Sequence, residues 1–229
     1  DSDDLDDCMD GKGDFAAMYG NPNASLYYFG SDEDTDGSMK TGTATVSIDG
    51  DSYNFMFSKS GGAEGKGKGL TGLDDGKYIY KFGMKMKAGS DDKYKIVYAT
   101  GDTGDDSAIV EEIDSAKLRR MSEEAVNKNK DGDTIKYTGT LNSDFYLVNT
   151  SGTIVKNKTS AKDGNDWYFY VEKSAIKMYT NNNTLSVDSK KVELKDTAGN
   201  ALKDWKTKSI QAEDNVSGTP ADELIDDGI

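Results

Sequence analysis

An aromatic segment followed by a polar, glycine-bearing turn recurs along this chain and constrains its fold more than any other feature. The first copy is LYYFGSDEDTDGSMKTG at 26–42, where an aromatic triplet leads into an acidic turn and a Gly-Ser-Met-Lys-Thr-Gly segment. Aromatic residues suit a half-buried pleated surface and Gly and Asp suit tight turns, so the stretch predicts a β-hairpin. The first three copies begin at Tyr27, Tyr53 and Tyr78, at intervals of 26 and 25 residues. A period of this length indicates stacked structural units.

Turn dipeptides strengthen the hairpin prediction. Alternating residues 45–48 lead through Asp49-Gly50 into the aromatic run 53–57, and Asp-Gly favours two-residue hairpin turns. Asp75-Gly76 precedes the run 78–80 in the same way. Further strands are expected at 94–98, 135–137, 145–147, 167–171, 185–187 and 191–194.

One stretch breaks the β pattern. Residues 107–127 contain good helix formers and lack Gly and Pro, and their apolar positions recur at spacings near three and four. We therefore expect a helix near 107–127 that covers one side of a sheet. A partner-binding helix is the alternative, which the narrow apolar stripe disfavours. The apolar positions are Val110, Ile113, Leu118, Met121 and Ala125.

The composition supports many small aromatic clusters in place of one deep aliphatic core. Hydrophobic residues make up 34% of the chain, and 13 Tyr, 7 Phe and 2 Trp supply much of the apolar surface. The predicted fold class is mainly β, with stacked, solenoid-like β-hairpin repeats and one inserted helix. The expected organisation is an acidic flexible lead-in (1–23), hairpin repeats (24–100), a helical insertion (101–138), further hairpin repeats (139–210) and an acidic flexible tail (211–229).

The charge is placed at the ends of the chain. The net charge is −14, and residues 1–50 carry 12 acids against 2 lysines, while the middle of the chain is nearly balanced. Binding to a nucleic acid backbone needs a concentrated basic face, so we expect no nucleic acid partner. No apolar run approaches the roughly 18 residues of a membrane span, and none is expected.

The counts of cysteine and histidine exclude several kinds of chemistry. Cys8 is the single cysteine, so no internal disulfide forms, and the chain contains no histidine. Ser-His-Asp and Cys-His catalytic arrangements and His-ligated zinc are therefore excluded. We predict that the chain is not an enzyme, has no catalytic residues and needs no cofactor.

Residues 127–133 fit either part of a calcium-binding loop or a plain polar turn. Asn127, Asn129 and Asp131 stand at loop positions 1, 3 and 5, with Gly132 at position 6. Thr138 stands at position 12, where the bidentate Glu is needed. A polar turn is the favoured interpretation, and no metal site is predicted.

A family resemblance enters with three segments. They are LYYFGSDEDTDGSMKTG, SIDGDSYNFMFSKSGGAEGKGKGLTGLDDGKYIY and FYLVNTSGTIVKNKTSAKDGNDWYFYV. Over 24–98 and 139–180 the chain resembles the cell wall-binding repeat proteins of Gram-positive gut bacteria, which are relatives of the choline-binding repeats. The resemblance implies a solenoid of β-hairpins on a secreted or surface protein. In the choline-binding relatives, aromatic cages hold a quaternary ammonium by cation–π attraction.

The chain departs from the family pattern at that cage. Leu26, Thr43 and Leu73 stand where tryptophans are expected, and Trp167 matches a cage tryptophan. We therefore expect no response to choline, and we favour packing between hairpins over ligand binding for the repeat aromatics. The candidate ligand-binding residues implied by the resemblance are Tyr27, Tyr28, Phe29, Met39, Tyr53, Phe55, Tyr78, Tyr80, Trp167 and Tyr168.

The functional prediction is a secreted, non-catalytic module that attaches to bacterial cell-wall polymers or glycans, or acts as a spacer there. The chain begins at Asp1 in place of Met, and we expect that a secretion signal has been removed. The expected location is extracellular or at the cell surface. The alternative function is a structural or protein-binding surface domain whose repeats have lost ligand binding.

Overall fold

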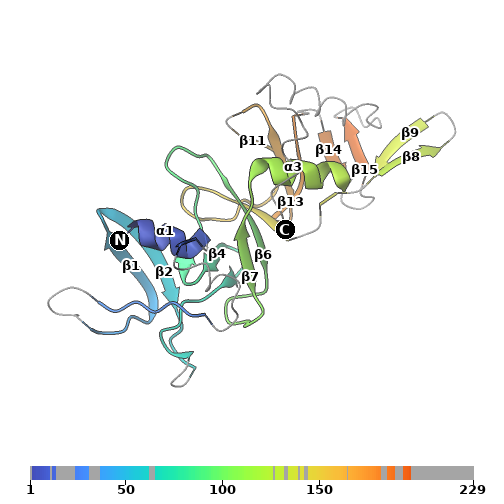
Figure 1. Ribbon diagram of the computed structural model, residues 1–229. Coiled ribbons are helices and arrows are strands. Elements are labelled where there is room, and N and C mark those ends of the chain that lie inside the picture. Colours follow the sequence, from blue (N-terminus) through green and yellow to red (C-terminus); the bar gives the residue numbers. More distant parts are fainter. Residues whose placement is uncertain are drawn as a thin grey trace. The chain divides into compact units, whose positions relative to one another are not determined.

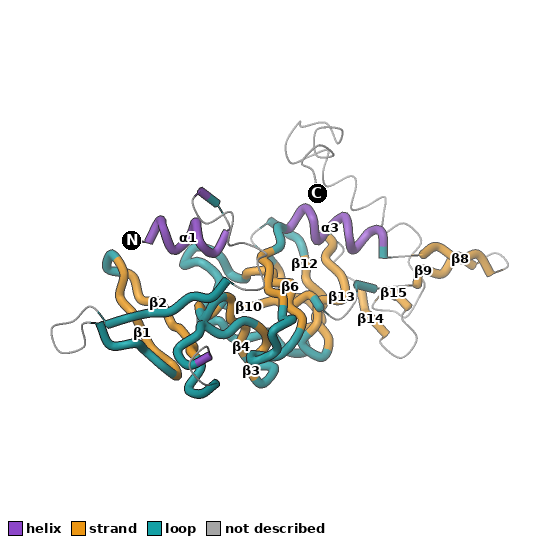
Figure 2. Tube along the Cα trace, turned by 60° about the horizontal axis from the view of Figure 1, so that its bottom comes forward, coloured by secondary structure: helices purple, strands orange, loops and turns teal. Residues whose placement is uncertain are grey.

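The protein is mainly β, with antiparallel strands and the helices α1 (Ser2–Asp10) and α3 (Ser115–Glu124) (Figures 1 and 2). It divides into two compact units, Asp1–Asp114 with Asp144–Val155 and Ser115–Ser143 with Lys156–Ile229. Within the described ranges, neither helix has the length and apolarity that a membrane crossing requires. The computed structural model describes residues 2–10, 12–13, 24–30, 37–61, 65–125, 127–131, 134–138, 140–141, 144–163, 165–181, 185–188 and 193–196.

The first sheet of the first unit is built from hairpins whose turns the sequence specifies. Asp49 and Gly50, between β1 and β2, have φ of 52° and 92°, and Phe82 and Gly83, between β4 and β5, have 49° and 92°. Two successive positive φ values fit the type I′ turns that match strand twist. The hairpin predicted at Asp49-Gly50 is therefore confirmed. The sheet has the order β1-β2-β5-β4-β3, from β1 (Gly42–Ile48), β2 (Asp51–Phe57), β3 (Gly72–Asp74), β4 (Tyr78–Lys81) and β5 (Met84–Lys85).

The stretch 26–42 folds back on itself as predicted. Phe29 and Met39 form an antiparallel bridge. The Lys40 N–H, after the turn, donates to the Tyr28 carbonyl oxygen, before the turn, at 2.8 Å. Because these bonds tie the two arms together, the aromatic triplet is held in a fixed backbone conformation. We call this segment the opening hairpin.

The second sheet of the first unit corrects the helix prediction. The helix expected near 107–127 is found only at its C-terminal half, as α3. The preceding residues Ile109–Glu112 form β7, in which Val110 pairs with Ala99 and is buried. β-Branched Ile109 and Val110 suit a strand, and pairing with a neighbouring strand outweighs a helical spacing of apolar residues. The sheet has the order β10-β6-β7, from β10 (Phe145–Val148), β6 (Lys95–Thr100) and β7 (Ile109–Glu112).

The second unit contains α3 and two groups of strands. α3 packs against β13, where Leu118 is fully buried and the Tyr179 N–H donates to Ser122 Oγ at 3.1 Å. The strands are ordered β11-β12-β13 and β14-β15-β9-β8, from β8 (Asn127–Asp131), β9 (Thr134–Thr138), β11 (Lys158–Lys162), β12 (Tyr168–Glu172), β13 (Ala175–Thr180), β14 (Leu185–Asp188) and β15 (Glu193–Asp196).

Residues 127–131 of the candidate calcium loop form a strand. Asn127, Asn129 and Asp131 lie along β8 and pair with alternate positions of β9. A strand rises about 3.3 Å per residue, so these backbone positions are spread along an extended line and do not curl around one ion. In the part of the chain that the structure describes, no group of three His, Cys, Asp or Glu residues could hold a metal ion.

The lead-in expected to be flexible at 1–23 is helical over its first part. α1 buries Cys8 and Met9, and Leu5 packs against the aromatic-rich cluster formed by Val46, Phe55 and Phe57. Although α1 is acidic overall, its apolar residues lie on one side, and this side packs against the rest of the unit. The remainder of that prediction, like the tail at 211–229, lies outside the described residues.

The first unit also has an aliphatic core that the composition did not predict. Its buried side chains come from strands of both sheets of that unit and from the loop after β10. Small and branched residues pack closely where the two sheets meet, so a few residues are enough to form a close-packed core. The cluster consists of Ile79, Met86, Val97, Ala99, Val110, Val148 and Ile154.

Candidate functional site

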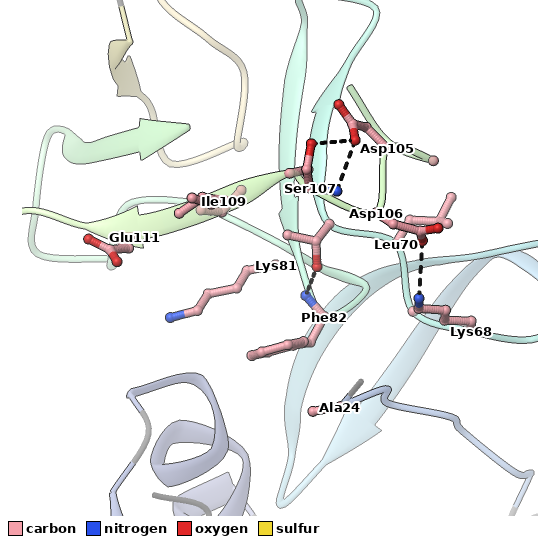
Figure 3. Close-up of a pocket in the computed structure, with 15 residues that line it drawn as sticks. Ala24, Lys68, Leu70, Lys81, Phe82, Asp105, Asp106, Ser107, Ile109 and Glu111 are labelled. Carbon is pink, nitrogen blue, oxygen red and sulfur yellow. Dashed lines mark hydrogen bonds and ion pairs between the residues drawn. The ribbon is translucent and has the colours of Figure 1, made fainter. Parts of the chain in front are cut away.

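A pocket of about 420 Å³ in the first unit is the candidate site (Figure 3). Its lining comes from Ala24 and from the segments 68–71, 81–82 and 104–111. These segments are the loop before β3, the end of β4, and the loop that leads into β7. The pocket is thus framed by both sheets of this unit.

Glycines bring the backbones of the floor together. A Cβ on Gly69 would lie 2.3 Å from the Phe82 carbonyl oxygen, and a Cβ on Gly83 would lie 2.9 Å from Gly69 Cα. The Gly83 N–H donates to the Leu70 carbonyl oxygen at 2.7 Å, and the Phe82 N–H donates to Thr71 Oγ1 at 2.9 Å. The close approach requires glycine, so the floor is fixed by backbone contacts.

The walls are apolar and the rim is polar. Leu70, Phe82 and Ile109 supply apolar surface, and Ile109 is 48% exposed. A mostly apolar hollow with a few fixed polar groups is the usual form of a small-ligand site. The side chains lie around the hollow as Figure 3 shows.

Two acidic side chains of the rim are held by neighbours. The Asp105 carboxylate accepts hydrogen bonds from the Ser107 N–H at 2.9 Å and the Ser107 hydroxyl at 2.7 Å, and these bonds lower the pKa of Asp105. Lys68 Nζ lies 3.5 Å from Asp106 Oδ1 (Figure 3). The Asp105 carboxylate is therefore an acceptor with a set orientation, and exposed Asp106 adds a second acceptor at the rim, both suited to binding hydroxyl groups.

Lys81 closes the inner side of the pocket. It is 6% exposed, and its ammonium group donates to the carbonyl oxygen of Met9 in the last turn of α1. Burial lowers the pKa of Lys81, while the nearby carboxylates of Asp10 and Glu111 act in the opposite direction. A positive group at the C-terminal end of a helix is electrostatically favourable. Lys81 therefore ties α1 to β4.

Three of the predicted candidates form an exposed patch on the opening hairpin. Tyr27, Phe29 and Met39 are 37%, 52% and 36% exposed. Met39 lies over Gly67, where an added Cβ would be 2.4 Å from the Met39 sulfur. The Gly69 N–H donates to the Leu26 carbonyl oxygen at 2.7 Å, which joins the opening hairpin to the edge of the pocket. We call Tyr27, Phe29 and Met39 the aromatic patch.

The other candidates of the first unit are packing residues to different degrees. Tyr28 and Tyr53 are half-buried against the cluster that contains Phe55, which is itself buried and stacked on Phe57. Tyr80 is buried, and half-buried Tyr78 meets it edge to face with ring centroids 6.5 Å apart. The packing interpretation therefore holds for Phe55 and Tyr80.

The cage positions do not form an aromatic cage. Leu26 packs against the Phe55 cluster and Leu73 against the aliphatic core, while Thr43 is exposed. An aliphatic side chain provides no π face for a cation.

Trp167 is a core residue of the second unit. It is 7% exposed, with its ring 5.0 Å from that of Tyr179 and the Arg119 guanidinium 5.3 Å from its ring centroid. The backbone N–H of Trp167 donates to Asp163 Oδ1 at 3.0 Å. Neighbouring Tyr168 is half-buried. Because the indole is covered, Trp167 is not available as a binding surface in this unit.

Sequence reasoning did not predict the pocket itself. Its apolar walls come from Leu70, Phe82 and Ile109, which belong to no motif that was singled out. A usable signal was present in the glycine run at 65–69, in which buried Gly69 marks a close backbone approach and buried Gly67 makes room for the Met39 side chain. Comparison of the chain with protein-family models, curated proteins and solved structures finds no match.

Proposed function

We propose that the first unit is a non-catalytic binding module that attaches to bacterial cell-wall polymers or glycans at the aromatic patch and the adjoining pocket. The observation that carries the proposal is the exposure of Phe29, at 52%, beside exposed Tyr27 on a hydrogen-bonded hairpin. Large aromatic side chains that stay exposed in a fixed backbone are typical of recognition surfaces.

The chemistry of the site suits a saccharide. A sugar ring has an apolar face that packs on an aromatic ring, and hydroxyl groups that need oriented acceptors. Tyr27 and Phe29 supply the rings, and the carboxylates of Asp105 and Asp106 supply acceptors at the pocket. Rigid aromatic groups contribute contact area at a low cost in conformational entropy.

The repeat architecture is part of the proposal. The aromatic segments at intervals of 26 and 25 residues and the resemblance to cell wall-binding repeats support stacked hairpin units. They also support secretion and a location at the cell surface. Neither the pocket nor the aromatic patch requires a cofactor for this function.

The test is co-sedimentation of the purified chain with Gram-positive cell walls. Replacing Tyr27 and Phe29 together by alanine is expected to weaken binding by at least about tenfold, because exposed aromatic anchors dominate interface energies. Tyr94→Ala, a half-buried tyrosine of the same unit outside the patch and pocket, is the matched control. Circular dichroism checks that each variant folds.

Two outcomes would contradict the proposal. Failure of the unmodified chain to bind walls or soluble glycans would favour the structural surface domain. Equal binding by the patch variant would move the site elsewhere. A tyrosine fluorescence titration with millimolar choline is expected to give no change, and a saturable change would show that a cage forms without the usual tryptophans.

A further inference from the structure

A local reversal of charge marks one part of the first unit. Between residues 77 and 90 the chain carries four lysines and no acidic residue, although its net charge is −14. This segment forms β4, β5 and the turns around them. Basic residues gathered in an acidic protein create a local field that attracts anions.

Three of these four lysines lie over two tyrosine rings, and the fourth, Lys81, is buried. Lys77 Nζ and Lys85 Nζ lie 4.9 Å and 4.6 Å from the ring centroid of Tyr78, so the two ammonium groups are at most 9.5 Å apart. Lys87 Nζ lies 6.0 Å from the ring centroid of Tyr53. Tyrosine rings hold these cations by cation–π attraction. We call Tyr53, Lys77, Tyr78, Lys85 and Lys87 the lysine–tyrosine strip.

Among the described residues, Lys77 and Lys85 form no ion pair, and Lys87 donates to the Ser52 carbonyl oxygen at 3.3 Å. Carboxylates lie near the strip without pairing with its lysines, since Asp6, Asp49 and Asp51 act electrostatically on Tyr53. By contrast, Lys95 is paired with Glu112. Two ammonium groups at this separation repel one another, and an anion bound near both would offset that repulsion by attracting each of them.

A hollow adjoins the strip. A pocket of about 190 Å³ is lined by Tyr53, Lys85 and Lys87, and it is bounded on its other side by Asp6 and Asp10 of α1. Asp10 is paired with Lys12 at 2.8 Å. The hollow therefore has a basic side with aromatic surface and an acidic side, and a ligand with spaced anionic groups would lie along the basic side.

We propose that the lysine–tyrosine strip binds the phosphodiester groups of an anionic cell-wall polymer. This inference rests on the proposed attachment function and adds a second contact to it. Ammonium groups bind phosphate as point charges, with no fixed geometry, so flexible lysines can follow the spaced phosphodiester groups of a chain. The tyrosine rings offer apolar contact to the uncharged units between phosphates.

The experiment measures binding of the full chain to poly(glycerol phosphate), with polygalacturonate and dextran as carboxylate and neutral polymers. Binding to poly(glycerol phosphate) is expected to weaken as salt rises, because exposed charges are screened. Replacing Lys77 and Lys85 together by glutamine is expected to weaken it by between about twofold and thirtyfold at low salt, as for two exposed ion pairs. Lys66→Gln with Lys156→Gln removes the same charge at exposed positions outside the strip and serves as control.

The outcomes separate the site from its ligand. Equal losses in the strip and control variants would mean that net charge alone acts, and this would overturn the site. Equal affinity for polygalacturonate would overturn the phosphate assignment.

A further comparison keeps this inference distinct from the attachment function. The Tyr27 and Phe29 variant is expected to bind poly(glycerol phosphate) as the unmodified chain does. Walls stripped of anionic polymers that still bind in a Phe29-dependent way, together with no binding to poly(glycerol phosphate), would retain the attachment function and reject the strip.

Discussion

Two aromatic hairpins of this protein differ in how far their aromatic side chains are exposed to solvent. In the opening hairpin of the first unit, Phe29 is 52% exposed, whereas in the β12–β13 hairpin of the second unit Phe169 is 3% and Trp167 is 7% exposed. Both carry consecutive aromatic residues, and in both the strands run antiparallel. The second hairpin has α3 packed against β13, with Leu118 fully buried. The aromatic-turn pattern therefore predicts a hairpin, and the element that covers it determines whether its aromatics form a core or a surface.

The largest expected effect of this difference is on stability in the second unit. Trp167→Ala removes a covered indole that stacks with Tyr179 and lies beneath Arg119. It is expected to lower the free energy of unfolding by about 3–5 kcal/mol, as for large aromatic residues in cores. Urea denaturation followed by circular dichroism measures the change. A loss below about 1 kcal/mol would mean that α3 does not cover the indole in solution.

A pH dependence sharpens the same contrast. The pKa of Tyr179 is raised above 10.0 by burial and by its hydrogen bond to Asp163. The unfolded chain therefore releases this proton first, and above pH 10 stability should fall by up to about 1.4 kcal/mol per pH unit until the folded state also ionises.

Denaturation at pH 9 to 11 measures this contribution. Below pH 10 the contribution of Tyr179 is complete, so a plateau is expected there. In Tyr179→Phe the free energy of unfolding should fall less steeply with pH above pH 10, because the contribution of Tyr179 is absent. An unchanged pH dependence would assign the fall to other titrating groups.

The smallest expected effect is that of Phe29→Ala on folding. About half of the Phe29 side chain is already in water, so its removal should change the free energy of unfolding by less than about 0.5 kcal/mol. The same denaturation assay measures it. A change as large as that of Trp167→Ala would erase the distinction between the two hairpins.

Local chemistry made the turns and many strands predictable. Asp49-Gly50 specifies its hairpin because both residues tolerate positive φ at low cost, and no distant residue is needed. The strands expected at 185–187 and 191–194 are found as the paired strands β14 and β15, in which Val187 pairs with Leu194, while residues 191 and 192 lie outside the described part of the chain.

What depends on distant partners was not predictable. Ile109 and Val110 have helical neighbours in sequence and yet join β6, because that pairing buries Val110. Cys8 and Met9 are buried in a segment expected to be flexible, since Lys81 meets the end of α1. The exposure of Trp167 likewise depends on a helix more than forty residues earlier.

The crossing of Gly69 and Gly83 has a consequence for how this binding surface could diversify. Any side chain at Gly69 would collide with the backbone at Phe82, so the floor of the pocket cannot be altered without moving both strands. The exposed rim and wall carry no such restriction, and Asp106 and Ile109 can be exchanged one at a time. A library that randomises these rim and wall positions and leaves the glycines untouched would sample new specificities on one scaffold, so mutational tolerance should differ sharply between adjacent residues of the same pocket.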